Sequence, residues 1–148
     1  GLIAAEYEEA KTKPEFIYVD VIGYGAGVKD RLKEQGLPAK GVNVAESASI
    51  NERYMRQRDE LWFRGFEWFN SREVKIPDQP DLIAELSAPT YEHTSTGKLK
   101  VESKDEIKER LLFSPDLADA FLLTFAAPKR SGRLKPFEFA KTKLRAWV

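Results

Sequence analysis

The stretch EFIYVDVIGYGAGVKDRLKEQGLPAKGVNVAES, residues 15–47, decides the fold of this chain. Its first segment, Glu15–Ile22, is rich in β-branched and aromatic residues, which predicts a strand covered on both faces. A glycine turn follows, residues 28–35 have the composition of a helix, Gly36 is typical of a left-handed helix stop, and residues 41–47 predict a second strand. Strand, helix and strand in this order form a βαβ unit with parallel strands, so the sequence predicts an α/β fold.

One charged residue, Asp20, interrupts the apolar run near the end of the first strand. Ligands of open α/β sheets gather beyond the carboxyl ends of the strands, where Asp20 and the glycine turn Gly23–Gly27 fall. Burying an ionised carboxylate is costly unless it meets a metal, a base or backbone amides. Asp20 is therefore a candidate functional residue, and a purely structural role is the alternative that the sequence leaves open.

The remaining patterns add helices and a hairpin around this unit. We expect a helix over residues 2–13, a long aromatic-rich helix over 50–70, a short strand over 74–76, a strand or a turn of helix over 81–86, a hairpin over 90–103 that closes near Thr96 and Gly97, a capped helix over 103–110 and an apolar helix from Ser114 to Ala127. The length of 148 residues suits a single domain over 1–148.

Composition excludes several classes of site. Lys and Arg number 24 and Asp and Glu number 24, so no overall field indicates a polyanionic or membrane partner. The chain has no cysteine, which excludes disulfides, thiolate zinc sites and cysteine nucleophiles. No apolar run approaches the roughly 20 residues of a membrane span, so we expect no membrane partner and a cytoplasmic location. The only histidine, His93, has no nucleophile partner nearby in sequence and is interpreted as an ordinary strand residue.

Two further acids, Asp116 and Asp119, stand three positions apart at the start of the expected apolar helix. That spacing places them on neighbouring positions of one helix surface. Together with Asp20 they would offer three carboxylates, a ligand set that suits Mg²⁺ or Mn²⁺. Two such ions about 4 Å apart can activate a water and stabilise the leaving oxygen in phosphodiester hydrolysis. The alternative is that Asp116 only complements the helix dipole and Asp119 is solvated.

Two weaker signals point to phosphate contacts. The glycine turn GYGAG imitates a phosphate-binding turn, yet the usual dinucleotide pattern places a glycine where this chain has Val28, so nucleotide binding is a minor alternative. Basic residues of the hairpin and of the tail are candidate DNA contacts, because lysine and arginine meet phosphates without reading sequence. These candidates are Lys98, Lys100, Arg130 and Arg133.

Four motifs in this order resemble a known family: FIYVDVIGYGAGVKDRL, then Gly41–Val44, then RDELW at Arg58–Trp62, and then SPDLADAFLLTFA. Together they resemble the C-terminal nuclease domain of tailed-phage terminase large subunits, over about Ile17 to Ala127. The resemblance implies a ribonuclease-H-like mixed sheet flanked by helices, with a small β-hairpin insertion. It also implies a DNA-packaging endonuclease that cuts concatemeric DNA with two divalent metal ions.

The resemblance assigns roles to the acids of this chain. Asp20 matches the family's second acid, at a strand end, and Asp119 matches the third, on a helix. Asp116 is implied as an auxiliary or alternative ligand. The departure is at the start, because none of the first residues matches the family's first strand and its catalytic Asp. We therefore expect a partial domain, such as a prophage remnant, that lacks the first strands and one ligand and has little activity alone.

Partners follow from the same resemblance. They are double-stranded DNA, the terminase small subunit, the portal, and the ATPase part, whose Walker motif does not occur in this sequence. A sheet without its leading strands exposes an edge, so we also expect a homodimer. The rival hypothesis is a non-catalytic assembly module, in which Asp20 is structural and the aromatic helix and basic tail bind a protein partner.

Overall fold

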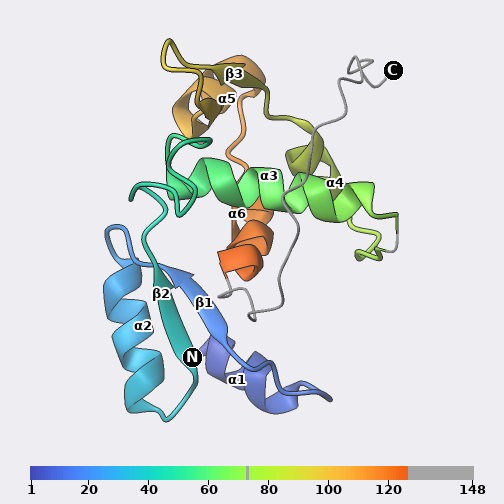
Figure 1. The fold of residues 1–148 in the computed structure, drawn as a ribbon. Helices are drawn as coiled ribbons and strands as arrows, with labels where there is room; N and C mark the ends of the chain where they lie inside the picture. Colours follow the sequence, from blue (N-terminus) through green and yellow to red (C-terminus); the bar gives the residue numbers. More distant parts are fainter. Residues whose placement is uncertain (73, 127–148) are drawn as a thin grey trace.

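The computed structural model of the protein describes residues 1–72 and 74–126 (Figure 1). Its elements in chain order are α1 (Leu2–Glu9), β1 (Ile17–Asp20), α2 (Gly25–Glu34), β2 (Ala39–Val42), α3 (Gln57–Asn70), α4 (Pro80–Ser87), β3 (Tyr91–His93), β4 (Leu99–Val101), α5 (Lys104–Leu111), α6 (Asp116–Leu122) and the 3₁₀ helix η1 (Leu123–Ala126). The α/β class predicted from the sequence is confirmed.

The βαβ unit forms as the sequence predicts. Strands β1 and β2 pair in parallel, with Ile17 opposite Ala39 and Asp20 opposite Val42, and α2 connects them. Gly36 takes a left-handed conformation with φ of 76°, which ends α2. The following amide, on Leu37, donates to the Leu32 carbonyl over 3.0 Å and closes the turn into β2.

The β1–β2 pair is covered on both faces, as its apolar sequence requires. Ile17 and Val19 pack with the buried Leu32, Leu37 and Ala39 on the side of α2. Because side chains alternate along a strand, Tyr18 points to the opposite face, where it joins a second core cluster built on α3, α6 and η1. Figure 1 shows α2 beside this strand pair and α6 between it and α3. Asp20 shares the face of Tyr18, so β1 directs it toward α6.

A third core cluster lies on the other side of α3. It contains Tyr54, Phe63, Leu99 and Val101, and Trp62 packs against both this cluster and the one around α6. The β3–β4 hairpin is antiparallel and closes through Gly97, whose φ is 79°, as predicted. Parallel and antiparallel pairing therefore both occur, in two separate two-stranded sheets.

Three element boundaries differ from the sequence prediction. Helix α2 begins at Gly25, inside the glycine turn, and β2 runs over Ala39–Val42 instead of 41–47. The strand stops because the Asn43 side chain accepts from the Ala45 amide over 3.2 Å and bends the chain into a turn. Helix α1 ends at Glu9, short of the predicted residue 13.

The long helix predicted over 50–70 starts only at Gln57. Upstream of it, the Arg53 carbonyl accepts from the Leu99 amide, and the Met55 amide donates to the Leu99 carbonyl. This segment therefore pairs with β4 and does not form a helix. The Asp59 carboxylate then accepts from the Arg56 amide over 2.9 Å and caps the true helix start. A helical pattern in the sequence was thus overridden by a tertiary strand contact.

The other differences lie nearer the C-terminus. Residues 74–76 form no strand, and the segment predicted as a strand or a turn of helix is the helix α4, with Pro80 in its first turn. The capping box of α5 is present, since Ser103 and Glu106 exchange hydrogen bonds with each other's backbone amides. Helix α6 ends at Leu122 and continues to Ala126 as a 3₁₀ turn. Within the described residues, none of the helices combines the length and the apolar character that a membrane span requires.

Candidate functional site

The three predicted aspartates line one pocket. Asp20, at the end of β1, and Asp116 and Asp119, on α6, border a cavity of about 540 Å³ between the β1–β2 pair and the α3, α5 and α6 helices. Four cationic side chains line the same cavity: Arg56, Arg58, Lys100 and Lys104. The pocket thus holds opposite charges side by side; of these groups, only Asp20, Asp116, Asp119 and Lys100 were candidates from the sequence.

Asp20 reaches the pocket because the backbone around it is tightly packed. A Cβ placed on Gly25 would collide with the Asp20 carbonyl oxygen, so only glycine lets the start of α2 approach the end of β1. Gly23 has a φ of 64°, which suits the turn between them. The Asp20 carboxylate accepts from the Ile22 amide over 3.1 Å. These contacts give the glycine turn a packing role, whereas sequence analysis considered it as a phosphate-binding turn.

Lys104 lies between the two acids of α6. Its Nζ is 2.9 Å from Asp116 Oδ1 and 3.1 Å from Asp119 Oδ2. The hydrogen bond from Lys104 lowers the pKa of the Asp116 carboxyl, and Ser114 adds to this effect. Burial alone would lower the pKa of Lys104, but the hydrogen bond to Asp116 and the charge of Asp119 outweigh it and raise that pKa. Both partners are therefore charged at neutral pH.

Asp119 is held from a second side by α3. Trp62 Nε1 donates to Asp119 Oδ1 over 3.0 Å, and Arg58 Nε lies 3.4 Å from the same oxygen. The other oxygen, Oδ2, is buried and makes no hydrogen bond to any described residue, although Lys104 is within ion-pair distance. The Asp119 side chain is only 16% exposed, and burying a carboxylate is costly unless it meets partners such as these.

The RDELW motif supplies much of this arrangement. Arg58 and Trp62 contact Asp119, while the buried Asp59 accepts from the Val101 amide over 2.9 Å and ties α3 to β4. Glu60 is 0% exposed and accepts from the Ser49 and Ile50 amides over 2.6 and 3.2 Å. No sequence pattern pointed to these roles, because contacts between residues far apart in the chain leave no local pattern.

The acids fit a cation as a pair. Asp116 and Asp119 already share the Lys104 ammonium group, and Asp119 Oδ2, which makes no hydrogen bond to a described residue, lies 3.1 Å from it, so a metal cation could take the same place. Among residues 1–72 and 74–126, however, no three His, Cys, Asp or Glu side chains are grouped so that they could hold a metal ion. Asp20 borders the same cavity without joining such a group, so the predicted three-carboxylate site stays a prediction.

The predicted DNA contacts have protein partners where they are described. Lys98 Nζ donates to Asn51 Oδ1, and Lys100 Nζ pairs with Glu92, each over 2.9 Å. Of these two lysines, Lys100 lines the pocket. Arg130 and Arg133 lie outside the described residues. His93 is exposed on β3, and its ring contacts the ring of Tyr91.

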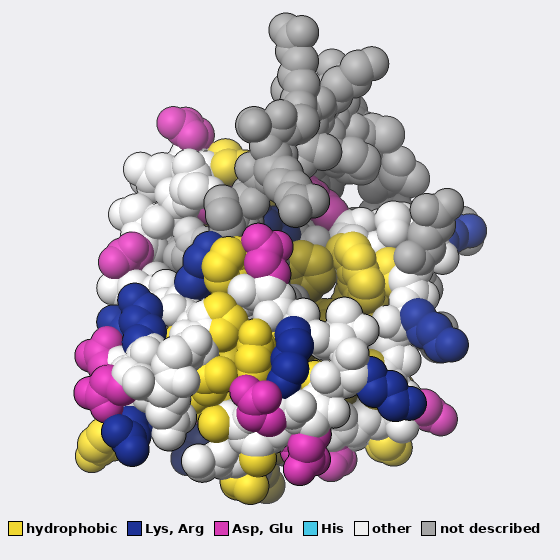
Figure 2. All heavy atoms as spheres, turned by 90° about the horizontal axis from the view of Figure 1, so that it is seen from below, with side chains coloured by type: hydrophobic (Ala, Val, Ile, Leu, Met, Phe, Trp, Pro, Cys, Tyr) yellow, Lys and Arg dark blue, Asp and Glu magenta, His cyan; other side chains and the backbone are white. Residues whose placement is uncertain are grey.

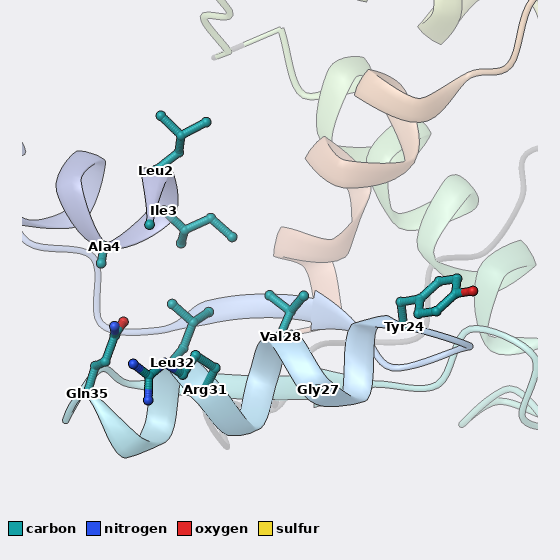
Figure 3. Close-up of a pocket in the computed structure, with 10 residues that line it drawn as sticks. Leu2, Ile3, Ala4, Tyr24, Gly27, Val28, Arg31, Leu32 and Gln35 are labelled. Atoms are coloured by element: carbon teal, nitrogen blue, oxygen red, sulfur yellow. The ribbon is translucent and has the colours of Figure 1, made fainter.

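A second cavity, of about 790 Å³, lies between α1 and α2 (Figure 3). Leu2 and Ile3 of α1 and Val28 and Leu32 of α2 line it, and Tyr24, at the start of α2, is almost fully exposed at its border. Figure 2, which views the molecule from below, shows hydrophobic side chains gathered in the middle of that face. Arg31 and Gln35 also line this cavity, so its lining is mostly but not wholly apolar.

Comparison with solved structures identifies the fold. The nuclease domain of the large terminase subunit gp2 of bacterial virus Sf6, as a mutant with manganese, matches with a TM-score of 0.67 and 21% identity, over 84% of this chain and 70% of that chain. The same domain with calcium matches with a TM-score of 0.67, and the domain described without a mutation matches with a TM-score of 0.57 and 19% identity. No protein-family model and no curated protein matches the sequence. The chain has the fold of this terminase nuclease domain, and the predicted ribonuclease-H-like class is confirmed.

Proposed function

We propose that this chain is part of a DNA-packaging terminase large subunit and that its pocket belongs to the nuclease. The observation that carries the proposal is the common pocket of Asp20, Asp116 and Asp119, in a fold that matches a terminase nuclease domain. One acid comes from a strand end and two come from a helix distant in sequence, as the resemblance implies. The reaction is then hydrolysis of phosphodiester bonds in concatemeric phage DNA.

Mg²⁺ or Mn²⁺ is the cofactor that this proposal requires. Asp119 and Asp116 would hold the ion, with Asp20 as the further ligand. When bound, the ion would supply an activated water and stabilise charge on the reacting phosphate. The Sf6 domain was solved with manganese and with calcium, which supports divalent binding in this fold. We expect weak cleavage or none from the isolated chain, because its described acids form a pair that Lys104 neutralises.

The cationic side chains that line the pocket could attract DNA, although basic and acidic residues are equal in number over the whole chain. Arg56 and Lys100 border the cavity that the acids share. They are close enough for Arg56 to influence the pKa of Lys100 through its charge, although Glu92 dominates that pKa and raises it. Phosphates entering the pocket could meet these side chains as position-independent charge contacts.

DNA binding across salt concentrations tests the proposal. We expect weak binding of duplex DNA whose affinity falls as salt rises, and a smaller salt slope, by about 2, for the double variant Arg56→Ala and Lys100→Ala. The matched control is the double variant Lys33→Ala and Lys11→Ala, which removes the same charge far from the pocket. Binding that is absent, or insensitive to salt, would refute a nuclease assignment.

A prediction concerns the lysine that neutralises the acids. Lys104→Ala is expected to raise the affinity for Mn²⁺ or Ca²⁺ about tenfold, because the ammonium that competes for Asp116 and Asp119 is removed. Isothermal titration calorimetry measures the change, and Lys33→Ala on α2 is the control. Unchanged affinity in Lys104→Ala would show that cations do not bind between these acids.

The alternative, a non-catalytic assembly module, is favoured by one observation. Asp116 and Asp119 are already paired with protein cations, as expected for acids that only hold helices together. The exposed apolar residues Leu2, Ile3 and Val28 beside the second cavity would serve self-association, the homodimer we predicted. The terminase small subunit, the portal and the ATPase part remain proposed partners of the intact system. Sedimentation of the chain, with and without DNA, separates assembly from DNA binding.

A further inference from the structure

We infer that Trp62 is a positioning residue for Asp119. It binds Oδ1 of the Asp119 carboxylate, so that Oδ2 faces the position where a cation would bind. The inference rests on the proposed function and adds a residue to it. Trp62 Nε1 donates to Asp119 Oδ1 over 3.0 Å across 57 positions of sequence. Oδ2 is the oxygen near Lys104 Nζ, at 3.1 Å. The two oxygens of one carboxylate therefore have separate partners.

Trp62 is itself fixed in place, as a positioning residue must be. Its ring packs against the cluster around Phe63 and against the cluster around Leu122. The Arg58 guanidinium, one helical turn earlier, lies 5.6 Å from the centre of the ring and 3.4 Å from Asp119 Oδ1. Arg58 is anchored in turn through a 2.8 Å hydrogen bond to the Glu102 carbonyl. An indole N–H held this way favours the carboxylate orientation in which Oδ1 faces α3.

The orientation matters because Asp119 is nearly buried. Without the indole donor, Oδ1 would keep only the Arg58 guanidinium at 3.4 Å, so the carboxylate would turn more freely and Oδ2 would leave the position between α5 and α6 in part of the population. A cation bound there would lose one ligand in part of the population. Trp62 thus acts on the cation through Asp119, without contact of its own.

The test compares two tryptophans of the same helix. Trp62→Phe removes the indole donor but keeps an aromatic ring, whereas Trp68→Phe changes a ring that packs on Phe121 and Phe125. We expect Trp62→Phe to weaken Ca²⁺ and Mn²⁺ binding about tenfold in calorimetry and Trp68→Phe to leave it unchanged, although both variants lower thermal stability. A merely structural role for Trp62 would give the two variants the same affinity.

A spectroscopic readout adds an independent check. In wild type, the Trp62 indole N–H resonance in a ¹⁵N–¹H NMR spectrum should shift on addition of Ca²⁺, and Asp119→Asn should abolish that shift. Cation binding that Trp62→Phe leaves unchanged would overturn the inference and leave the proposed function standing. Failure of the wild type to bind either cation would overturn the proposed metal site and the inference with it.

Discussion

Gly25→Ala is expected to destabilise the protein by about 3 kcal/mol or more, at the upper end of what overpacking costs. The added Cβ would meet the carbonyl oxygen and carbon of Asp20, which are backbone atoms at the end of β1. Unlike the end of a flexible side chain, these atoms move only if β1 separates from α2. The measurement is urea denaturation followed by circular dichroism.

Gly27→Ala is the matched control for this prediction. Gly27 lies in the same helix, and a Cβ there would meet nothing within 4 Å. Alanine is a better helix former, so Gly27→Ala should stabilise the protein by about 0.5 to 1 kcal/mol. Opposite signs for two identical substitutions two positions apart would be hard to explain by helix propensity alone. Equal effects of the two substitutions would contradict the close approach of α2 to β1.

The same substitution bears on the pocket. Because Gly25 touches the backbone of Asp20, the strain of Gly25→Ala acts at the residue proposed to bind a cation. We would therefore expect lower affinity for Mn²⁺ in whatever folded fraction remains. Gly27→Ala should leave the affinity unchanged, since a Cβ at Gly27 would meet no atom within 4 Å.

The sequence predicted the elements whose signals are local. The βαβ unit followed from an apolar strand, a glycine turn and Gly36, and the hairpin followed from the turn at Gly97. The start of α5 followed from the spacing of Ser103 and Glu106. Each of these depends on interactions within a few positions of the chain, which is the range that periodicity and capping patterns report.

The sequence could not predict what tertiary contacts decide. The segment before Gln57 carries a helical pattern but pairs with Leu99, a contact available only once the hairpin has formed. In the pocket, the acids were predicted from residue type and from the resemblance. Lys104, Arg58 and Trp62 were missed, because a cation or an indole that meets an acid across the fold has no characteristic spacing.

The predicted acids and the residues that contact them must be considered together to interpret the pocket. Acids alone would repel one another and require a cation, whereas Asp116 and Asp119 here meet Lys104, Arg58 and Trp62. A metal bound between these acids would therefore have to displace part of an existing network. This competition is the reason to measure cation affinity in Lys104→Ala before cleavage in any variant.

Glu60→Gln is expected to cost about 3 to 5 kcal/mol of folding free energy, the range for breaking a buried ion pair. Glu60 is fully buried, accepts from the Ser49 and Ile50 amides, and pairs with Arg64 one turn later on α3. Burial alone would raise its pKa, but hydrogen bonds from Ser49 and the charge of Arg64 outweigh it and lower that pKa. Glutamine keeps the shape but places an amide donor against groups that donate.

The pH dependence follows from the sign of that shift. A carboxyl whose pKa is lower in the folded protein stabilises it fully above the unfolded value of about 4.5, and the stability is lost as pH falls toward the folded pKa. The difference between wild type and Glu60→Gln should therefore be largest near pH 7 and shrink below about pH 4.5. Urea denaturation at pH 7 and pH 4 measures both values. Glu67→Gln, a half-exposed acid on the same helix, is the control and should change stability by no more than about 0.5 kcal/mol at either pH. A difference for Glu60→Gln that stays constant with pH would assign its cost to packing instead of charge.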